Sequence, residues 1–461
     1  MAEFLTDYLP ILMLIVFAVL IFTGFPVAFL LGGVGVATTL VAMAAGIFPE
    51  EAFYNNSLRI FGTFSGSYIF PAVAMLLFMG VALEQSGVSR EMLKCLHLLF
   101  RRVPGSLAVS VTIIGVLLAP SAGMVGASVS MLTLVALPTM IDRHYPVQVA
   151  ASAVAAGGTL GLILPPGLML IFLASRLQLT VGEMFLATVV PGLLLVAIYI
   201  FYFICRGVID PAMRGSRVSE ESISGLQLLV YVLRSLALPA LLIAAVLGSI
   251  IGGYATPPQS AAVGAVGSLL LMVFNGSFSV RRLHTVIRGT LEITGMVILI
   301  VMAALVFSYP FRFFSGDELV RDFIGSLGFE DWGILISVLV ITFVLGFFID
   351  WIEITVITIP IFFPLLMNLD FTSYTGSPTL TVVWMATLFA LILQTSFLTP
   401  PFGFALFHIR SAAPAWVKIG DIYKGVMPIL ALQLIVIMLV LFFPGLATHL
   451  PDAVFEISKN R

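Results

Sequence analysis

Long apolar stretches separated by short polar ones run through the whole chain. Runs of about 18 residues or more recur, and each can cross the hydrocarbon core of a bilayer as a helix. The runs are continuous rather than alternating, so helices are expected instead of barrel strands. The expected elements are about 8–24, 26–46, 66–86, 88–103, 106–140, 146–175 and 183–206, then 230–254, 257–275, 289–309, 312–328, 332–368, 379–410 and 422–445.

Four of these elements differ from simple spans. The segments 106–140 and 332–368 are paired apolar stretches with a polar middle, which predicts helical hairpins. Glycine and proline interrupt 146–175 and 379–410, which predicts two broken helices. Irregular backbone at membrane depth is tolerated only against protein or a water-filled cavity, so these breaks point to a binding site.

The chain also resembles itself at an offset of about 235 residues. Three matches occur in the same order, which shared composition explains poorly. They are Pro26, Gly32 and Gly35 with Pro258, Gly264 and Gly267; 161–166 with 396–401; and 181–185 before Pro191 with 419–423 before Pro428. The two halves are therefore predicted to be copies of one unit.

Lysine and arginine placement sets the expected orientation. If 106–140 enters and leaves from one face, the basic residues of 101–102, 142–144, 206–217 and 281–288 share one side. The positive-inside rule makes that side cytoplasmic. The second hairpin then enters from the opposite face, both termini are periplasmic, and about ten full crossings remain.

The predicted fold class is an all-α polytopic membrane protein. It is an inverted-topology repeat with two re-entrant helical hairpins and two broken helices. The first repeat covers 1–206, a cytoplasmic linker 207–225, the second repeat 226–446 and a C-terminal tail 447–461. Many secondary transporters share this plan and bind their ligands near the midplane, where discontinuous helices meet.

Composition narrows the class of protein. Hydrophobic residues make up 60% and charged residues 10% of the 461, against about 25% charged in soluble proteins, so a lipid bilayer is the expected solvent. The net charge is −2 without a basic stripe, which argues against nucleic acid as a partner.

Two cysteines make no disulfide framework. The N-terminus lacks the basic region of a signal peptide, so the first run is expected to remain as a span. No HExxH, GxGxxG or P-loop motif is present, and no enzymatic activity is expected.

Two carboxylates, Asp350 and Glu353, interrupt a segment that otherwise reads as membrane. Residues 332–349 and 354–369 carry no charge. A charged side chain at mid-bilayer costs about 2.5–3.5 kcal/mol on insertion scales, so such residues usually face a cavity or an ion path. This pattern predicts transport.

The breaks also suggest which groups bind. Carbonyls at helix C-terminal ends, together with hydroxyls, can coordinate sodium, whereas helix N-termini favour an anion. Two or more sodium sites related by the repeat are expected, with the substrate between them and no other metal. The first sodium site is predicted at Ser121, Gly161, Leu164 and Pro166, and the second at Asp350, Ser396, Thr399 and Pro401. The residues expected to contact the substrate are Gly123, Gly126, Ser128, Thr159, Glu353, Thr355, Gln394, Thr395 and Arg410.

Each assignment has a simpler alternative. Hydroxyls can bond to their own helix, and small residues can serve helix packing. Asp350 could lie in water at the base of the hairpin, and Glu353 could be a structural ion pair or a protonated acid. Arg410 could anchor the cytoplasmic interface, and His408 is expected to be interfacial. Two acids matched by the repeat are interpreted as helix starts, where acids complement the helix dipole: Glu183 and Asp421.

With its paired hairpins, double-proline breaks and the tip Phe-Ile-Asp-Trp-Ile-Glu-Ile at 348–354, the chain resembles the large, DctM-like membrane subunit of tripartite ATP-independent periplasmic (TRAP) transporters, a family of the ion transporter superfamily. The resemblance implies a sodium-driven importer in the bacterial inner membrane, working with a small four-helix membrane subunit and a periplasmic substrate-binding protein. It implies organic-acid substrates such as dicarboxylates, keto acids and sialic acids. It also implies an elevator mechanism, in which 105–206 and 330–446 move past a scaffold of 8–103 and 226–328.

Two other transport functions stay open. The first is a stand-alone carboxylate or anion symporter of the same superfamily, driven by sodium without a binding protein. The second is a sodium/proton antiporter, because two intramembrane acids would suit proton exchange.

Overall fold

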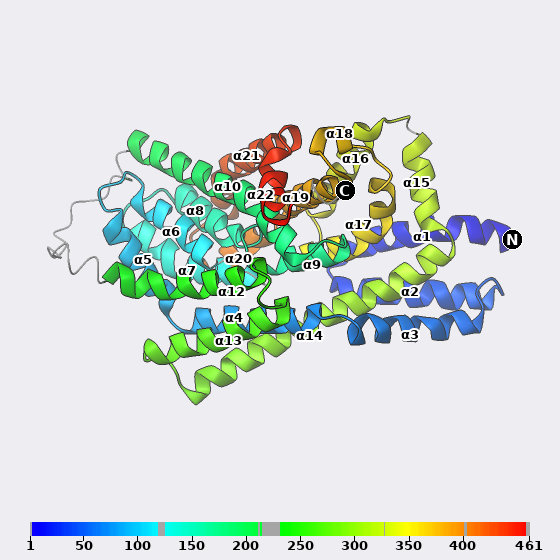
Figure 1. Cartoon of the computed structure of the whole chain (residues 1–461), viewed down its shortest axis with the longest axis horizontal. Coiled ribbons are helices and arrows are strands. Elements are labelled where there is room, and N and C mark those ends of the chain that lie inside the picture. Colours follow the sequence, from blue (N-terminus) through cyan, green and yellow to red (C-terminus); the bar gives the residue numbers. More distant parts are fainter. Residues whose placement is uncertain are drawn as a thin grey trace. The chain divides into compact units, whose positions relative to one another are not determined.

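The computed structural model describes residues 2–118, 125–210, 213, 231–326, 328–400 and 403–457, and the elements in these ranges are helices (Figure 1). This confirms the expected all-α class. By length and composition, seven described helices can cross a membrane, or eight if one bent pair counts as a span. The expected span at 8–24 corresponds to α1, a helix of 20 residues, and the span at 230–254 contains the apolar helical segment Ser235–Ile251.

The chain divides into two compact units. Unit 1 comprises Met1–Phe70 and Thr294–Asp370. Its helices are α1 (Ala2–Ile21), α2 (Val27–Ala44), α3 (Glu50–Ser65), the second part of α14 (Val280–Phe313), α15 (Gly316–Ser326), α16 (Asp331–Leu345) and α17 (Trp351–Leu366). Within it, α1 lies along α2 (Figure 1), and a Cβ on Gly35 of α2 would come within 2.7 Å of the Val306 carbonyl in α14.

The pattern of apolar runs predicts no helix at 50–65, where α3 lies. Pro49 precedes this helix, and Glu50 and Glu51 occupy its first turn, where acids complement the helix dipole. Polar residues such as Asn55 and Asn56 interrupt its apolar pattern. A search for continuous apolar runs therefore passes over it.

Unit 2 comprises Pro71–Ile293 and Phe371–Arg461. Its first helices are most of α4 (Ile69–Gln85), α5 (Val88–Leu99), α6 (Ser106–Leu117), α7 (Val125–Asp142), α8 (Val147–Leu160), α9 (Leu168–Arg176) and α10 (Val181–Ile209). A π-helical turn (Leu233–Ala237) then leads into α12 (Leu238–Ile251), followed by α13 (Pro257–Phe274) and the start of α14. The last are α18 (Thr372–Thr375), α19 (Pro378–Ser396), α20 (Phe404–Ala412), α21 (Ile419–Phe442) and α22 (Gly445–Phe455), which lies at the predicted tail.

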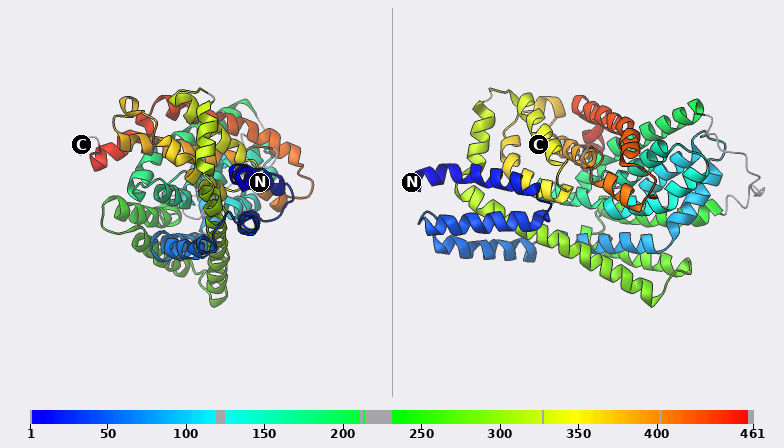
Figure 2. Two further views of the ribbon diagram at one scale, coloured as in Figure 1. Left: turned by 90° about the vertical axis from the view of Figure 1, so that its right-hand side faces the viewer. Right: turned by 180° about the vertical axis from the view of Figure 1, so that it is seen from behind.

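Helix α8 forms the centre of unit 2, packed against α6, α7 and α21 (Figures 1 and 2). It is buried from Val149 to Leu160. Gly157 and Gly158 are among the glycines that interrupt the sequence of 146–175, but both lie inside α8. A Cβ on Gly157 would come within 2.7 Å of the Val111 carbonyl of α6, and one on Gly158 would collide with Val129 of α7. These glycines permit close helix packing, and the break begins after them.

The two predicted hairpins consist of short helices in contact with each other. In unit 1, α16 has 15 residues and α17 has 16, so each is about 23 Å long, less than the roughly 30 Å of a hydrocarbon core. In unit 2, α6 has 12 residues and packs against α7. Helices α6, α16 and α17 are thus shorter than a full span, whereas α7 has 18 residues and is about 27 Å long. Their re-entrant orientation, the inverted topology of the halves and the division into scaffold and moving parts stay predictions.

Candidate functional site

Both predicted broken spans are present in unit 2, and their turns share one hydrogen-bond pattern. Helix α8 ends at Leu160 and α9 resumes at Leu168, while α19 ends at Ser396 and α20 resumes at Phe404. In each turn, two successive amides donate to the carbonyl of a threonine near the end of the first helix. The donors are Gly161 and Leu162 to Thr159, and Phe397 and Leu398 to Thr395.

This pattern corrects the register of the repeat. The double prolines align Gly161 with Ser396, an offset of 235 (396 − 161), whereas the hydrogen bonds pair Gly161 with Phe397, an offset of 236 (397 − 161). The glycines that begin the second half-helices, Gly167 and Gly403, obey the offset of 236 as well (403 − 167). The double prolines give a different offset because they lie one residue closer to the end of the first half-helix in the second turn than they do in the first turn.

The first turn concentrates carbonyl oxygens beside Gly167. A Cβ at that position would lie 2.9, 3.0 and 3.1 Å from the carbonyl oxygens of Gly161, Leu162 and Leu164. Such freed carbonyls of a broken membrane helix are the ligand type that coordinates sodium in transporters. Gly161 and Leu164 were predicted as ligands, and Leu162 was not. Pro166 is buried in the same turn.

The second turn is built differently. A Cβ on Gly403 would lie 2.8 Å from a single carbonyl oxygen, that of Phe397. The hydroxyls of Thr395, Ser396 and Thr399 each donate to a carbonyl of the preceding turn, over 2.7, 2.6 and 3.0 Å. In the first span, Thr159 does the same toward Ala155 over 2.9 Å. Because the hydroxyl hydrogen is used within the helix, the oxygen lone pairs are left to accept from a ligand or to coordinate a cation.

Gln394 is the most exceptional of the predicted substrate residues. Its side chain is 0% exposed, and neither the amide oxygen nor the amide nitrogen has a hydrogen-bond partner within the described residues. A buried polar group without a partner costs about 1–3 kcal/mol. In native proteins a buried polar group usually has a hydrogen-bond partner. Gln394 lies near the end of α19, directly before Thr395, and its role as a substrate contact stays a prediction.

The start of α7 meets α20 through His408, a contact that the sequence did not predict. The ring of His408 occupies the space that a Cβ on Gly126 would fill, with its Nε2 2.5 Å from that position. Its Nδ1 lies 3.3 Å from the hydroxyl of Ser130, and the ring packs edge-on against Phe404. His408, predicted to be interfacial, is half-buried. It brings the second broken span against the first predicted hairpin, next to the predicted substrate residues Gly126 and Ser128.

Asp350 and Glu353 form a capping box at the start of α17 in unit 1. The Asp350 carboxylate accepts from the amide of Trp351 over 2.6 Å, and the Glu353 carboxylate accepts from the amide of Asp350 over 3.2 Å. Glu353 is buried and Asp350 half-buried. Their spacing, an acid followed three residues later by Glu before an apolar run, is the sequence signature of such a box. Thr355 follows in the same helix and bonds to Trp351.

The other predictions divide as follows. Thr180 and Glu183 form a second capping box, and Asp421 lies in the first turn of α21, so both acids start helices as expected. The guanidinium of Arg410 lies 3.5 Å from the carbonyl of Ala415 just beyond α20, which fits the interfacial-anchor interpretation. Ser121, Gly123 and Pro401 lie outside the described residues.

Two residues of the site, Leu162 and Gly167, were not among the predicted ligands, and the contact of His408 with Gly126 was not predicted. A glycine directly after the double proline was a usable signal for Gly167, because a glycine at the start of a half-helix permits close approach of backbone. No local pattern marks His408, because its partners Gly126 and Ser130 lie in the other half of the chain.

Comparison with known proteins shows which family the chain belongs to. Residues 14–446 match the family described as "Tripartite ATP-independent periplasmic transporter, DctM component". The C4-dicarboxylate TRAP transporter large permease protein DctM of Pseudomonas aeruginosa is 27% identical over 89% of this chain and 92% of its own. The sialic acid TRAP transporter large permease protein SiaM of Vibrio cholerae is 25% identical over 94% and 96%. The crystal structure of the YdaH transporter of Alcanivorax borkumensis shares the fold, with a TM-score of 0.57 at 15% identity over 85% of this chain and 88% of that one. The family match covers most of the chain and confirms the resemblance drawn from the hairpins and the double-proline breaks, so this chain belongs to the DctM family of TRAP transporter large membrane subunits.

Proposed function

We propose that this protein imports a small organic carboxylate, driven by sodium, after delivery by a periplasmic binding protein. Its family makes it a transporter permease component. Two of its relatives are named for C4-dicarboxylate and for sialic acid, which are both carboxylates. These names support the class of solute.

The observation that carries the sodium proposal is the convergence of three carbonyl oxygens beside Gly167. Backbone carbonyls do not titrate in the physiological range, so this site suits an alkali cation and not a proton. The antiporter alternative rested on Asp350 and Glu353, and both carboxylates already accept hydrogen bonds in a capping box. The site therefore favours symport. Asp350, with Ser396 and Thr399, stays the proposed second sodium site.

The amide of Gln394 supports the location of the solute. It offers two N–H donors and a carbonyl acceptor. The donors can bind a carboxylate or keto oxygen, and the acceptor can bind a neighbouring hydroxyl group. The N-terminus of α7, at Gly126 and Ser128, would add backbone N–H groups and the positive end of a helix dipole. Thr159, Thr395 and Glu353 stay proposed contacts of the solute, and Arg410 is proposed as an interfacial anchor.

We further propose that the chain works with a small four-helix membrane subunit in the inner membrane, with both termini periplasmic. The elements that carry the ligand groups are short helices and broken spans, so we propose that 105–206 and 330–446 move in an elevator mechanism while 8–103 and 226–328 stay fixed. Family membership supports the partners, because the family is the membrane component of tripartite periplasmic transporters.

Uptake into proteoliposomes tests the proposal. The chain is purified with its small subunit, and a panel of radiolabelled dicarboxylates, keto acids and sialic acids is offered with and without the binding protein. We expect accumulation that needs an inward sodium gradient and the binding protein together. Equal uptake after replacement of sodium by potassium would reject sodium coupling, and equal uptake without the binding protein would favour the stand-alone symporter.

A further inference from the structure

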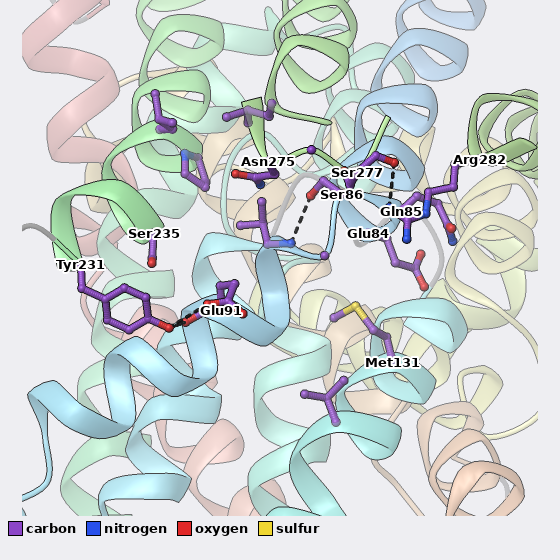
Figure 3. A pocket seen from close by; sticks show the side chains of 17 residues that line it. Glu84, Gln85, Ser86, Glu91, Met131, Tyr231, Ser235, Asn275, Ser277 and Arg282 are labelled. Carbon is purple, nitrogen blue, oxygen red and sulfur yellow. Dashed lines mark hydrogen bonds between the residues drawn. The ribbon is translucent and has the colours of Figure 1, made fainter. Parts of the chain in front are cut away.

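Unit 2 contains a polar cavity whose lining includes none of the residues of the candidate transport site. Its volume is about 840 Å³, within the roughly 300–1,000 Å³ range of small-molecule sites. The cavity lies where α4 ends and α5 begins, beside the end of α13 and the first turn of α14 (Figure 3). Met131 and Val135 of α7, with Leu238 and Pro239 of α12, supply apolar walls.

Several polar groups of this cavity are unengaged. Within the described residues, no hydrogen bond or ion pair involves the side chains of Glu84, Gln85 or Asn275, which Figure 3 places around the cavity. The other carboxylate, Glu91, is engaged, because it accepts from the hydroxyl of Tyr231 over 2.8 Å. A partly enclosed carboxylate near lipid is costly without a partner. Glu84 and the two amides are therefore free to bind a ligand.

The cavity also contains a fixed cation. The guanidinium of Arg282 donates to the carbonyl of Ser277 over 2.7 Å, which holds it against the wall (Figure 3). Arginine has five N–H donors, so most of them stay available. Arg281, His284 and Arg288 also lie in α14, but they do not line the cavity, and Arg288 pairs with Glu292 over 2.7 Å.

The charges decide the class of ligand. Two carboxylates and one guanidinium line the cavity, so the organic anion proposed as cargo would be repelled. A simple cation would match Glu84 but leave Arg282 without a counterion. A molecule with both an amine and a phosphate satisfies both side chains. The apolar walls beside the charges suit the glycerol and first acyl carbons of a lipid.

We propose that this cavity binds an ethanolamine phosphate ester, with the ammonium on Glu84 and the phosphate on Arg282. The site is separate from the transport site, and phosphatidylethanolamine of the surrounding bilayer is the source that its position at helix ends favours. A soluble glycerophosphoethanolamine has the same chemistry.

Native mass spectrometry of the purified full-length chain tests this assignment. The protein is exchanged into micelles containing lipids of matched acyl chains whose headgroups are ethanolamine, N-methylethanolamine, N,N-dimethylethanolamine and choline. Because the headgroup loses its N–H donors stepwise along this series, retention should fall stepwise, by about tenfold between the ends, the scale of one charge-assisted hydrogen bond. Equal retention of the ethanolamine and choline lipids would overturn the proposal without any variant.

Two substitutions separate the two ends of the ligand. Glu84→Gln should abolish the preference for ethanolamine over choline, whereas Arg282→Gln should lower the retention of both lipids together. Glu318→Gln changes an exposed acid of α15 in unit 1 and should leave retention unchanged. An unaltered headgroup preference in Glu84→Gln would also overturn the proposal. Binding of soluble glycerophosphoethanolamine by wild-type protein but not by Glu84→Gln, with no lipid retained by either, would support the same site with a soluble source.

Discussion

Gly167→Ala is the sharpest test of the proposed sodium site, because it adds one methyl group at the point where the carbonyls converge. Gly167 has φ −73° and ψ 139°, a conformation that alanine adopts without strain. The backbone is therefore not the cause of any effect. The new Cβ would lie 2.9–3.1 Å from three carbonyl oxygens, so these oxygens must move by a few tenths of an ångström.

The size of the effect follows from this crowding. Overpacking a close-packed site costs about 1–3 kcal/mol. If the added methyl group destabilises the sodium-bound state by this amount, sodium affinity should fall roughly 5- to 150-fold. The assay is thermal unfolding of the purified chain at rising sodium concentration, with potassium keeping the ionic strength constant. Ligand that binds only the folded state raises the unfolding temperature, so the half-maximal sodium concentration can be measured without transport.

Gly420→Ala is the matched control. Gly420 lies in the first turn of α21, and nothing lies within 4 Å of a Cβ added there. Alanine should keep or slightly raise stability at this helical position and leave the sodium dependence unchanged. The reasoning is refuted if Gly167→Ala shows the wild-type sodium dependence, or if both substitutions shift it equally.

Other substitutions separate binding roles from structural ones. Asp350→Asn keeps a good N-cap but removes the charge, so a sodium ligand at this position predicts loss of sodium-dependent uptake with a normal unfolding temperature, while Asp350→Ala should also lower stability by about 1 kcal/mol. Gln394→Leu removes a buried amide without partners, so we expect unchanged or higher stability together with at least tenfold weaker uptake of the solute; unchanged uptake would exclude a solute contact. Gly126→Ala should crowd the ring of His408 and slow uptake, and His408→Ala in the same chain should restore part of the rate; a double variant as slow as Gly126→Ala alone would exclude this contact as the cause.

Much of the fold was accessible from the sequence because lipid imposes a simple rule on it. Continuous apolar runs must be helices, and proline and glycine mark where they break. The helix boundaries near 147–176 and 378–412 follow from that rule. The same rule does not predict helix α3, because polar residues interrupt its apolar pattern. The glycines at 157–158 could not be interpreted from the sequence, because glycine can either loosen a helix or let two helices approach closely. Their packing partners Val111 and Val129 show that close approach is their role here.

The sequence predicts the part of the candidate site that consists of backbone carbonyls. A double proline removes amide donors, and carbonyls nearby are freed as a consequence, which is why Gly161 and Leu164 could be named in advance. The contact between His408 and Gly126 could not, because it joins residues from opposite halves of the chain. Asp350 and Glu353 admit two explanations, and their role in ion or solute binding stays a prediction. Their polarity within an apolar segment suggested ion binding, although their spacing also had a local explanation as a helix start.

The corrected register explains how two similar turns could serve different ligands. At an offset of 236 (394 − 158), Gly158 of the first span corresponds to Gln394 of the second. No side chain fits at Gly158, because α7 packs directly against it through Val129, so this position adds no polar side chain to the first span. At Gln394 the same position holds a buried amide whose polar atoms lack partners within the described residues. Bare carbonyls suit a spherical cation, which needs no donor. A carboxylate needs donors, and the amide supplies them. Divergence at this one position would thus let a repeated turn bind sodium in one half and an organic anion in the other, and both ligands would then depend on the same broken-helix packing.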